Sequence, residues 1–510
     1  MILRNRFIFW FIFLLVLLDR AWVLHAFGFQ FTSNDDLLFW LGAKDYGHGI
    51  FHEPFMYGQN YNFMLESVFA APFLRLGMAP EHIFPIVTAS LSLIPFLTFG
   101  IYYLRKGNLP AACLFVAMPL LLPVQYDMLT TMSRGFVTGI FFFAFYPRIS
   151  RMKKVWLKQF LLGAIFAAAY VVNPNSLPLV LFFCVFILLD EFQSWPTFIF
   201  AVIGALPFFI LNYFAKQFYI HHPEALMHEI SPWMLAFHWD LVREAFGQLD
   251  RHFAYLSPWW PNGSVALALL FLSVVGLFWM KRPKEAIALF VAFLLILFSF
   301  AFAKVHDGKD SVFFAYSRMF LALPLLLCLA FATFSEKIRN QPRFAALLAL
   351  VCVAFFSIKL AKTNSVVAAE TTSPKDLPIR IARVDSIHTN AQKINVVAQR
   401  ENAELILGID GTIAYPDLEF YLWGGEVFYD NFKPNLVWNF DRRSWRKTEE
   451  LSKVHAAILI VGGKKDWMAH CLSVHANAIQ CSDGSLPMYI LRNNQQSTHD
   501  LLLELGEIQR

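Results

Sequence analysis

The chain has 510 residues, of which 57% are hydrophobic and 15% charged, and its mean hydropathy is +0.50. Soluble proteins carry about 25% charged residues. This composition excludes a cytosolic globular enzyme, a disordered protein and a disulfide scaffold, and it predicts a multi-span membrane protein. The net charge of +5 does not indicate nucleic-acid binding, because the basic residues lie in short patches between apolar runs.

Apolar runs recur along the first two thirds of the chain. A membrane-spanning helix needs about 20 mostly apolar residues. The first run should stay in the protein as an anchor, because it lacks the small-residue cleavage site of a signal peptide. We predict eleven spans, at residues 7–27, 83–104, 109–125, 135–147, 156–172, 177–189, 197–214, 264–280, 286–303, 319–334 and 344–361.

Basic residues between these runs predict the orientation in the membrane. Cytoplasmic loops carry an excess of lysine and arginine, and the basic clusters, such as Arg105 with Lys106, all fall on one side of the eleven spans. The N-terminus is therefore expected in the cytoplasm. The segments 28–82 and 215–263, and everything after about residue 362, are expected on the external side.

The last third of the chain changes character and is predicted to be soluble. A helical stripe of apolar residues runs from Ile381 to Val397, and helix-compatible stretches separate the strand-like runs that follow. Strands alternating with helices indicate a small α/β domain. We therefore predict a transmembrane domain at 1–362, which includes the external loop 28–82, and an external α/β domain at 363–510. The three strand-like runs are Glu404–Ile409, Ala456–Val461 and Met488–Leu491.

Two cysteines, Cys471 and Cys481, lie in this predicted external domain, where a disulfide could persist. Their separation in the sequence does not decide whether they meet. The other four cysteines lie in predicted spans, where packing roles are expected.

Asp19 and Arg20 lie within the first span. Adjacent positions on a helix point in different directions, so the two side chains do not form a ready-made pair. We expect each to bond to neighbouring spans rather than to serve in a reaction.

The first external loop carries two adjacent carboxylates, Asp35 and Asp36, directly before an apolar helix. Acidic residues favour the first turn of a helix, so this pair predicts a helix start. A carboxylate at the membrane–water interface can also act as a general base or a metal ligand. The two interpretations are compatible, because a capped helix end holds a carboxylate rigidly.

The surrounding pattern, Asp-acid-x-x-aromatic-Trp-x-x-Ala-Lys, resembles the first-loop motif of GT-C membrane glycosyltransferases. It is most similar to the bacterial protein-mannosyltransferase and aminoarabinose-transferase-like group. Asp35 matches the aspartate of that motif, and Asp36 replaces its usual glutamate. Two further segments are similar to that group: Tyr57–Pro72, with Tyr-Gly-Gln-x-Tyr before Leu-Glu and Ala-Ala-Pro, and Tyr316–Pro324, with an arginine before Leu-Pro.

The resemblance implies a polytopic α-helical fold with about eleven spans in the bacterial inner membrane. It also implies transfer of a sugar from a polyprenyl-phosphate donor to a lipid, glycan or protein acceptor on the external face. Asp35 is the expected general base, and Asp36 or Glu66 would orient it or the acceptor. The expected substrate-loop residues are Tyr57, Gln59 and Tyr61.

The donor phosphate requires cations. An external arginine beside a span can bind a phosphate with two parallel hydrogen bonds, so Arg318 is the first candidate and Arg134 the second. Lys304 and Lys309 lie in the same loop as Arg318 and could supplement it. A divalent cation such as Mg²⁺ or Mn²⁺ at Asp35 and Asp36 is also compatible with carboxylate ligands.

Two other function classes remain open at this point. Eleven spans would also suit a transporter or a lipid flippase, although the sequence has no internal repeat of the kind many transporters show. A non-catalytic component of envelope polysaccharide assembly is the third class. In each case membrane lipids surround the protein, and no nucleic acid is expected as a partner.

Overall fold

The computed structural model describes residues 2–191, 196–372, 381–409, 418–438, 441–462, 478–482, 486–492 and 495–504. Contacts group the chain into two compact units, which we name the helical unit and the α/β unit. The domain boundary predicted at residue 362 is based on where the sequence changes from apolar to mixed composition. The two units are defined by contacts instead, so the predicted boundary stays a prediction. The helical unit comprises Met1–Phe29, Phe84–Phe214 and Ile230–Leu377; the α/β unit comprises Gln30–Ile83, Ala215–Glu229 and Pro378–Arg510.

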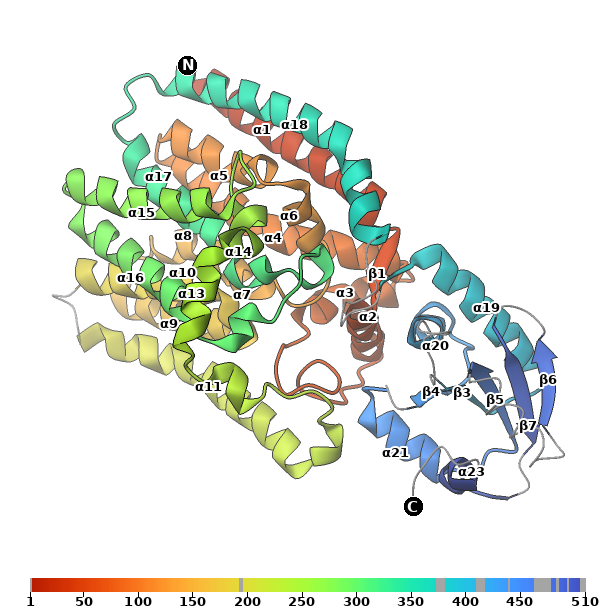
Figure 1. Ribbon diagram of the computed structural model, residues 1–510. Helices are drawn as coiled ribbons and strands as arrows, with labels where there is room; N and C mark the ends of the chain where they lie inside the picture. Colours follow the sequence, from red (N-terminus) through yellow and green to blue (C-terminus); the bar gives the residue numbers. More distant parts are fainter. Residues whose placement is uncertain are drawn as a thin grey trace. The chain divides into compact units, whose positions relative to one another are not determined.

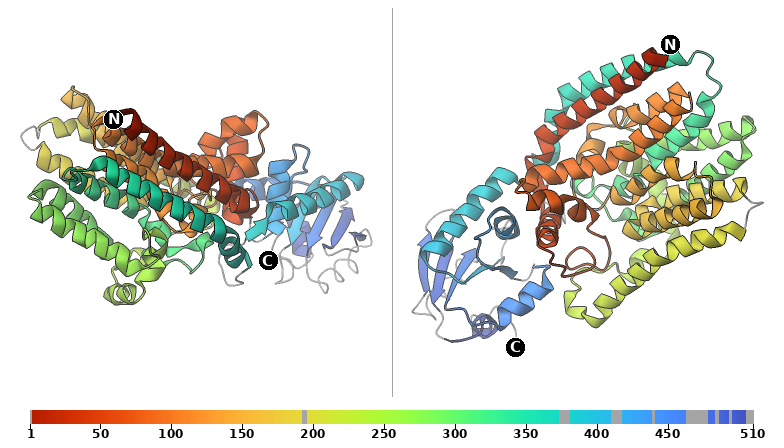
Figure 2. Two further views of the ribbon diagram at one scale, coloured as in Figure 1. Left: turned by 90° about the horizontal axis from the view of Figure 1, so that it is seen from above. Right: turned by 180° about the vertical axis from the view of Figure 1, so that it is seen from behind.

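The helical unit consists of helices of unequal length, among which α1 and α18 run side by side in Figures 1 and 2. Helix α4 begins, and helix α11 ends, within residues of the α/β unit. The helices are α1 (Ile2–Val23), η1 (Leu24–Gly28), α4 (Pro80–Arg105), α5 (Leu109–Leu121), α6 (Val124–Leu129), α7 (Thr138–Phe141), η2 (Phe142–Phe145), α8 (Tyr146–Ile149), α9 (Val155–Val172), η3 (Pro174–Ser176), α10 (Leu177–Asp190), α11 (Phe198–His221), α12 (Pro232–Leu235), α13 (Trp239–Gly247), α14 (Leu249–Phe253), η6 (Ala254–Leu256), α15 (Gly263–Trp279), α16 (Pro283–Ser299), η7 (Ala303–His306), η8 (Val312–Phe314), η9 (Tyr316–Phe320), α17 (Leu323–Ser335) and α18 (Gln341–Thr372).

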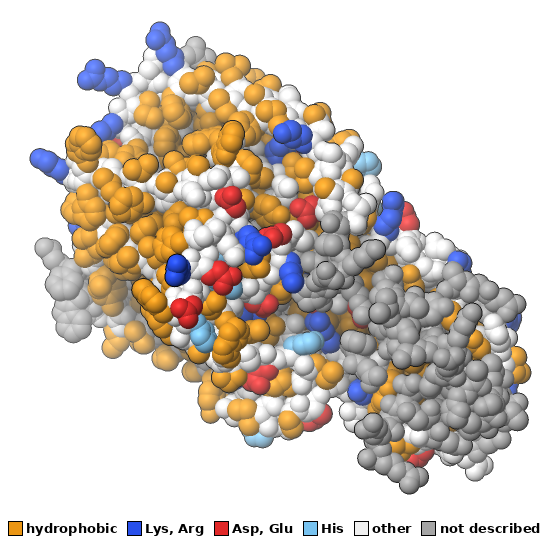
Figure 3. Space-filling model, in the orientation of Figure 1, with side chains coloured by type: hydrophobic (Ala, Val, Ile, Leu, Met, Phe, Trp, Pro, Cys, Tyr) orange, Lys and Arg blue, Asp and Glu red, His pale blue; other side chains and the backbone are white. Residues whose placement is uncertain are grey.

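Several of these helices are suited to a membrane. Hydrophobic side chains spread widely over the helical unit in the face shown in Figure 3. Such exposed apolar surface is stable in lipid rather than in water. Among the described residues, five helices are long and apolar enough to cross a membrane: Arg6–Gly28, Pro80–Arg105, Val155–Val172, Phe198–His221 and Gln341–Thr372.

Helices form at all eleven predicted spans, but the exact number of spans stays a prediction. Residues 135–147 differ most from a single spanning helix. There, three short helical pieces, α7, η2 and α8, run from Thr138 to Ile149. Pro147 cannot donate a backbone hydrogen bond to the preceding turn, which favours a break there. At about 1.5 Å rise per residue, this stretch is shorter than a bilayer's hydrocarbon core of about 30 Å.

A buried group of charges joins α1, α6 and α18. Arg20 pairs with Asp127 at 2.9 Å and also donates to the Thr130 hydroxyl at 2.8 Å. Lys359 of α18 pairs with Asp19 at 2.8 Å and with Asp127. All four charged side chains are nearly fully buried. The expectation that Asp19 and Arg20 bond to neighbouring helices is thus confirmed by these contacts.

The α/β unit contains a five-stranded sheet with the order β4-β3-β5-β7-β6. Strand β3 is parallel to β4 and β5, whereas β7 is antiparallel to β5 and β6. The elements are β1 (Phe31–Ser33), α2 (Asn34–Gly47), α3 (Leu65–Arg75), η5 (Pro223–Ala225), β2 (Ile381–Arg383), α19 (Val384–Arg400), β3 (Leu405–Ile409), α20 (Leu418–Phe428), β4 (Asn435–Trp438), α21 (Ser444–Ser452), β5 (Ala457–Gly462), β6 (Ala478–Ser482), β7 (Met488–Arg492) and α23 (Thr498–Glu504).

Helices cover both faces of this sheet, with α19 and α20 on one side and α21 and α23 on the other (Figure 1). Leu407 belongs to the core cluster that includes Leu501 and Leu502 of α23. A Cβ atom on the neighbouring Gly408 would lie 2.7 Å from Leu422 of α20. Strand β3 is therefore buried on both faces, which explains why its sequence reads as a continuous apolar run.

The three segments predicted as strands are β3, β5 and β7, and the predicted apolar stripe lies on α19. Cys471, the residue with which Cys481 could form a disulfide, lies outside the described residues. A short antiparallel pair, β1 with β2, joins the segment that follows η1 to the start of the last third of the chain, with Thr32 opposite Ala382. This pairing brings the first loop into the same unit as the sheet.

We expect Lys359→Met to destabilise the protein by about 3–5 kcal/mol, because it leaves Asp19 and Asp127 buried without their shared cation. Unfolding of the purified protein in detergent measures this difference. Lys362→Ala, on an exposed position of the same helix, is the matched control and should change stability by less than about 0.5 kcal/mol. Equal effects of the two substitutions would contradict the structural importance of the buried group.

Candidate active site

Helix α2 begins with a capping box that fixes both aspartates of the first loop. The Asp36 carboxylate accepts hydrogen bonds from the Ser33 backbone N–H at 3.0 Å and from its hydroxyl at 2.7 Å. The Asp36 N–H in turn donates to the Ser33 hydroxyl at 3.2 Å. These reciprocal bonds pair backbone N–H groups that otherwise have no hydrogen-bond acceptor at the start of a helix. The predicted helix start is confirmed, and Asp36 organises it.

Asp35 lies one residue earlier, in the same first turn, and is 8% exposed. Its Oδ1 accepts a hydrogen bond from Nη1 of Arg442, at 2.7 Å. The two residues are 407 positions apart in the chain. A charge-assisted bond of this kind is stronger than a neutral one and orients the carboxylate.

The position of Arg442 depends on its neighbours, Asp441 and Arg443. The Asp441 carboxylate accepts from the Arg443 side chain at 2.7 and 2.8 Å, and from the Val437 N–H at 3.0 Å. Arg443 also pairs with Glu426 of α20 at 2.6 Å and is 1% exposed. Because both flanking residues are held in the core, the backbone at Arg442 is fixed and its side chain reaches Asp35.

The loop of the predicted substrate motif packs directly against Arg442. Gly58 has a φ of +76°, and a Cβ there would lie 3.0 Å from the Arg442 Cβ. Its carbonyl accepts hydrogen bonds from the N–H groups of Met227 and His228, at 3.0 and 2.9 Å. Glycine is required here for both reasons: the backbone is in the left-handed region and a side chain would meet Arg442.

Glu53 lies beneath this loop and is 1% exposed. Its Oε2 accepts from the Gly58 N–H at 3.0 Å and from the Tyr219 hydroxyl at 3.2 Å, whereas its Oε1 is buried without a hydrogen-bond partner. Burial raises the pKa of Glu53 to about 7, and the two hydrogen bonds only partly oppose that rise. Glu53 is therefore a carboxyl group that can hold a proton near neutral pH.

Tyr57 does not lie on the surface of the loop, because it is fully buried. Its hydroxyl donates to Asp45 of α2 at 2.5 Å. Burial raises the pKa of Asp45 to about 6, while the bond from Tyr57 lowers it. The His52 ring stacks on Trp445 of α21 at a centroid distance of 3.5 Å. This side of the loop is thus attached to both α2 and α21.

Glu66, Gln59 and Tyr61, the other candidates from the sequence in the α/β unit, differ in burial and in contacts. Glu66 is fully buried on α3, next to Ser67, whose hydroxyl donates to the Phe39 carbonyl of α2 at 2.7 Å. Gln59 is buried and bridges to the backbone of His228, whereas Tyr61 is half-buried. The structure therefore brings Asp35, Asp36, Glu66 and the loop residues into one unit with Arg442.

The two arginines expected to bind phosphate belong to the helical unit, where they lie around the same two rings. The Arg318 guanidinium is 4.0 Å from the Phe314 ring centroid, and that of Arg134 is 5.0 Å from the Phe136 centroid. Arg134 donates to the Phe313 carbonyl, and Arg318 donates to the Ala315 carbonyl at 2.8 Å. Both are 5% exposed, so they hold the loop before α17 together rather than extending into lipid.

The two lysines of that loop differ from each other. Lys304 pairs with Asp307 at 2.7 Å, and Asp307 also accepts from Arg318 through its backbone carbonyl. Lys309 is exposed, and its N–H donates to the Phe314 carbonyl at 2.8 Å. Lys309 is therefore presented to solvent on a loop whose path Arg318 fixes.

The described residues do not form a recognisable metal site. Among them, no group of three or more histidine, cysteine, aspartate or glutamate side chains is arranged to hold a metal ion. The Asp36 carboxylate caps α2, and the Asp35 carboxylate contacts Arg442, so a cation at this pair would have to compete with those bonds. The divalent cation suggested by the two aspartates stays a prediction.

Comparison with known proteins gives a structural match across nearly the whole chain. A crystal structure of ArnT from Cupriavidus metallidurans bound to undecaprenyl phosphate covers 94% of this chain, and 97% of that chain is covered, with a TM-score of 0.57 and 12% identity. The fold resembles that of ArnT. The apo structure of the same protein matches with a TM-score of 0.58 and 11% identity over the same shares. No protein-family model and no curated protein matches the sequence.

Sequence reasoning did not find Arg442 or Glu53. Arg442 lies in the charged run Asp441-Arg442-Arg443, but nothing local distinguishes it from a solvated surface arginine. Glu53 stands alone between a histidine and a proline. Only its burial against Tyr219, 166 residues away, separates it from an ordinary loop glutamate.

The raised pKa of Glu53 predicts a pH-dependent stability. In the folded protein Glu53 keeps its proton up to about pH 7, whereas in the unfolded chain it loses it near its usual pKa of 4.5. Its contribution is therefore complete below pH 4.5 and is lost as the pH rises through 7. We expect Glu53→Gln to reduce the loss of stability between pH 5 and pH 8, because glutamine stays neutral and can accept the same bonds.

Thermal unfolding in detergent across that pH range provides the measurement. Asp45, whose pKa is about 6, contributes with the same sign, so some pH dependence should remain in the variant. The exposed Glu449 is the matched control, and Glu449→Gln should leave the wild-type pH profile unchanged at those pH values. An identical slope in wild type and Glu53→Gln would rule out the buried, protonated state.

Proposed function

We propose that this protein is a membrane glycosyltransferase of the GT-C type that uses a polyprenyl-phosphate-linked sugar donor. The observation that carries the proposal is the fold. It resembles ArnT over 94% of the chain, and one of the ArnT structures was determined with undecaprenyl phosphate bound. The motif around Asp35 and the Tyr57–Pro72 segment support the same conclusion independently of the fold.

The geometry of Asp35 fits a general base. It stands in the first turn of α2, where the helix start and Arg442 fix the direction of its carboxylate. In the proposed step the acceptor hydroxyl gives its proton to Asp35, and its oxygen bonds to the anomeric carbon of the sugar. The bond between that carbon and the phosphate oxygen breaks, and polyprenyl phosphate leaves. Arg442 acts as a positioning residue, and Asp36 or Glu66 orients Asp35 or the acceptor.

For the donor phosphate, we propose Arg318 and Arg134 with Lys304 and Lys309. Two arginines held around shared phenylalanine rings form a compact positive group, and phosphate is recognised well by such groups. The substrate loop with Tyr57, Gln59 and Tyr61 would contribute to the acceptor or sugar site. The proposed location is the bacterial inner membrane, with the N-terminus in the cytoplasm and the α/β unit's C-terminal segment outside.

We expect Asp35→Asn to reduce sugar transfer by about 10²–10⁴-fold, because it removes the proton acceptor while keeping the shape of the side chain. The assay incubates purified protein with a panel of radiolabelled polyprenyl-phosphate sugars and membrane extract as acceptor. Asp385→Asn, an identical change at an exposed helix start, is the matched control and should keep full activity.

Undiminished transfer by Asp35→Asn would reject Asp35 as the base. If folded wild-type protein transfers no sugar from any donor in the panel, the glycosyltransferase proposal fails and transport of a lipid-linked substrate becomes the next function to measure.

The proposed role of Arg318 and Lys309 in binding the donor phosphate is tested by measuring how the rate of transfer depends on donor concentration. We expect Lys309→Ala to raise the KM for the donor by roughly two- to five-fold, the effect of one exposed charge, without a change in unfolding temperature. Arg318→Ala should weaken donor use more and also lower the unfolding temperature, because Arg318 holds the loop. Lys337→Ala, an exposed lysine after α17, is the control. An unchanged donor KM in both loop variants would remove this loop from the donor site.

A further inference from the structure

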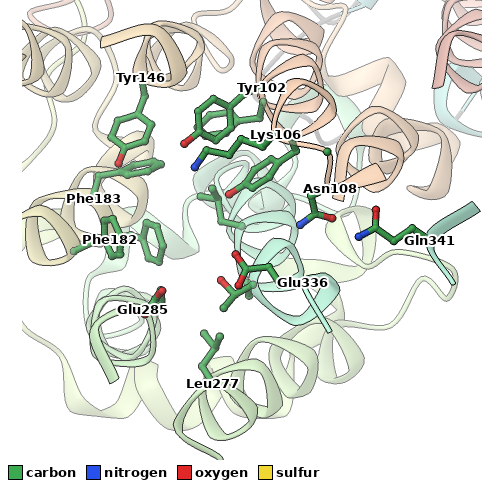
Figure 4. Close-up of a pocket in the computed structure, with 17 residues that line it drawn as sticks. Tyr102, Lys106, Asn108, Tyr146, Phe182, Phe183, Leu277, Glu285, Glu336 and Gln341 are labelled. Atoms are coloured by element: carbon green, nitrogen blue, oxygen red, sulfur yellow. The ribbon is translucent and has the colours of Figure 1, made fainter. Parts of the chain in front are cut away.

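The helical unit contains a cavity of 410 Å³ that the proposed transfer reaction does not use (Figure 4). It lies beside the turn between α4 and α5, and residues of α10, α15, α16 and α17 also line it. Its volume falls within the range of about 300–1,000 Å³ that is usual for small-molecule sites. Seven of the 17 residues that line it are aromatic: Phe99, Tyr102, Tyr103, Tyr146, Phe182, Phe183 and Phe186.

A rigid turn carries Lys106 into this cavity. Gly107 has a φ of +79°, which lets the chain reverse between α4 and α5. Asn108 then caps α5 by accepting from the Ala111 N–H at 3.2 Å, and it donates to the Ala332 carbonyl of α17 at 3.1 Å. The Lys106 ammonium lies 4.5 Å from the Tyr102 ring centroid and extends toward the space near Tyr146 (Figure 4).

A second cation contacts the same ring. The Arg151 guanidinium lies 4.5 Å from the centroid of Tyr102. Neither Lys106 nor Arg151 has a carboxylate partner among the residues that the structure describes. Both are exposed. Lys106 lines the cavity, whereas Arg151 lies beside it, where its attraction to the face of the lining residue Tyr102 helps to hold it.

The acidic residues on the opposite wall do not cancel these charges. Glu336 is paired with Arg282 at 2.5 Å, and Glu285 lies 3.7 Å from the same guanidinium. Figure 4 shows both glutamates across the cavity from Lys106. The cavity therefore combines several aromatic lining residues with Lys106 in its wall and Arg151 beside Tyr102, and neither cation is paired with a carboxylate of the described residues.

We propose that this cavity binds an anionic glycerophospholipid, with its phosphate paired to Lys106 and Arg151 and its glycerol and first methylene groups against the aromatic wall. Basic pockets between transmembrane helices on the cytoplasmic side suit anionic lipid headgroups. The basic residues of the sequence predict that this end of the helices faces the cytoplasm, where such lipids are available. The site is separate from the proposed transfer reaction, whose residues lie in segments predicted to be external.

Native mass spectrometry of the full-length protein in a neutral detergent tests this assignment. The probes are phosphatidylglycerol, phosphatidylcholine and glycerol 3-phosphate, each titrated alone. We expect one phosphatidylglycerol to bind saturably, more tightly than phosphatidylcholine, and glycerol 3-phosphate to bind no more than weakly because it has no apolar part. Lys106→Ala and Arg151→Ala should each weaken phosphatidylglycerol binding by roughly five-fold.

Lys284→Ala is the matched control, because Lys284 is on the neighbouring α16 but is paired with Asp190 at 2.8 Å. It should leave the affinity unchanged. Thr333→Trp is a second variant that fills the cavity without removing a charge, and it should reduce binding in protein whose unfolding temperature is unchanged. Equal binding of phosphatidylcholine, or equal loss in Lys284→Ala, would overturn the proposal. Tight binding of glycerol 3-phosphate would also overturn it and would assign the cavity to a soluble phosphate ester.

Discussion

The carboxylate of Asp127 receives both buried cations of the group that joins α1, α6 and α18. A charge taken out of water is costly unless a partner of opposite sign lies beside it. Arg20 and Lys359 meet this requirement from two helices that lie far apart in the chain. The relative placement of these helices is therefore constrained by charge as well as by apolar packing, and apolar packing alone specifies little in a lipid environment.

The same requirement shapes the α/β unit. Arg443 is enclosed by Asp441 and Glu426, and that enclosure fixes the backbone from which Arg442 reaches Asp35. The first loop and the last third of the chain consequently form one unit, in which the β1–β2 pair provides the backbone connection. A substitution near residue 441 would therefore act on an aspartate of the first loop, although the two are separated by most of the sequence.

Some candidate residues owe their role to neighbours in the sequence, whereas others owe it to tertiary contacts. Asp36 satisfies the start of α2, a role that follows from its spacing to Ser33 alone. Arg318 and Arg134 are candidates for the donor phosphate because each lies beside a predicted span, and in the structure both donate to backbone carbonyls of one loop. Their positive charge is thus concentrated and immobilised. A group of this kind can recognise a phosphate with little reorganisation, because its geometry is fixed before the ligand arrives.

The sequence by itself determined the membrane character, the helices at the predicted spans, the strands β3, β5 and β7, and the helix start at Asp35 and Asp36. These features depend on hydropathy, periodicity and capping, which act over a few residues. The tertiary structure alone decided that Arg442 meets Asp35, that Glu53 is buried against Tyr219, and that Arg151 meets the Tyr102 ring. Each is a contact between segments whose separation leaves no local pattern, because it is produced by packing and by the pairing of charges.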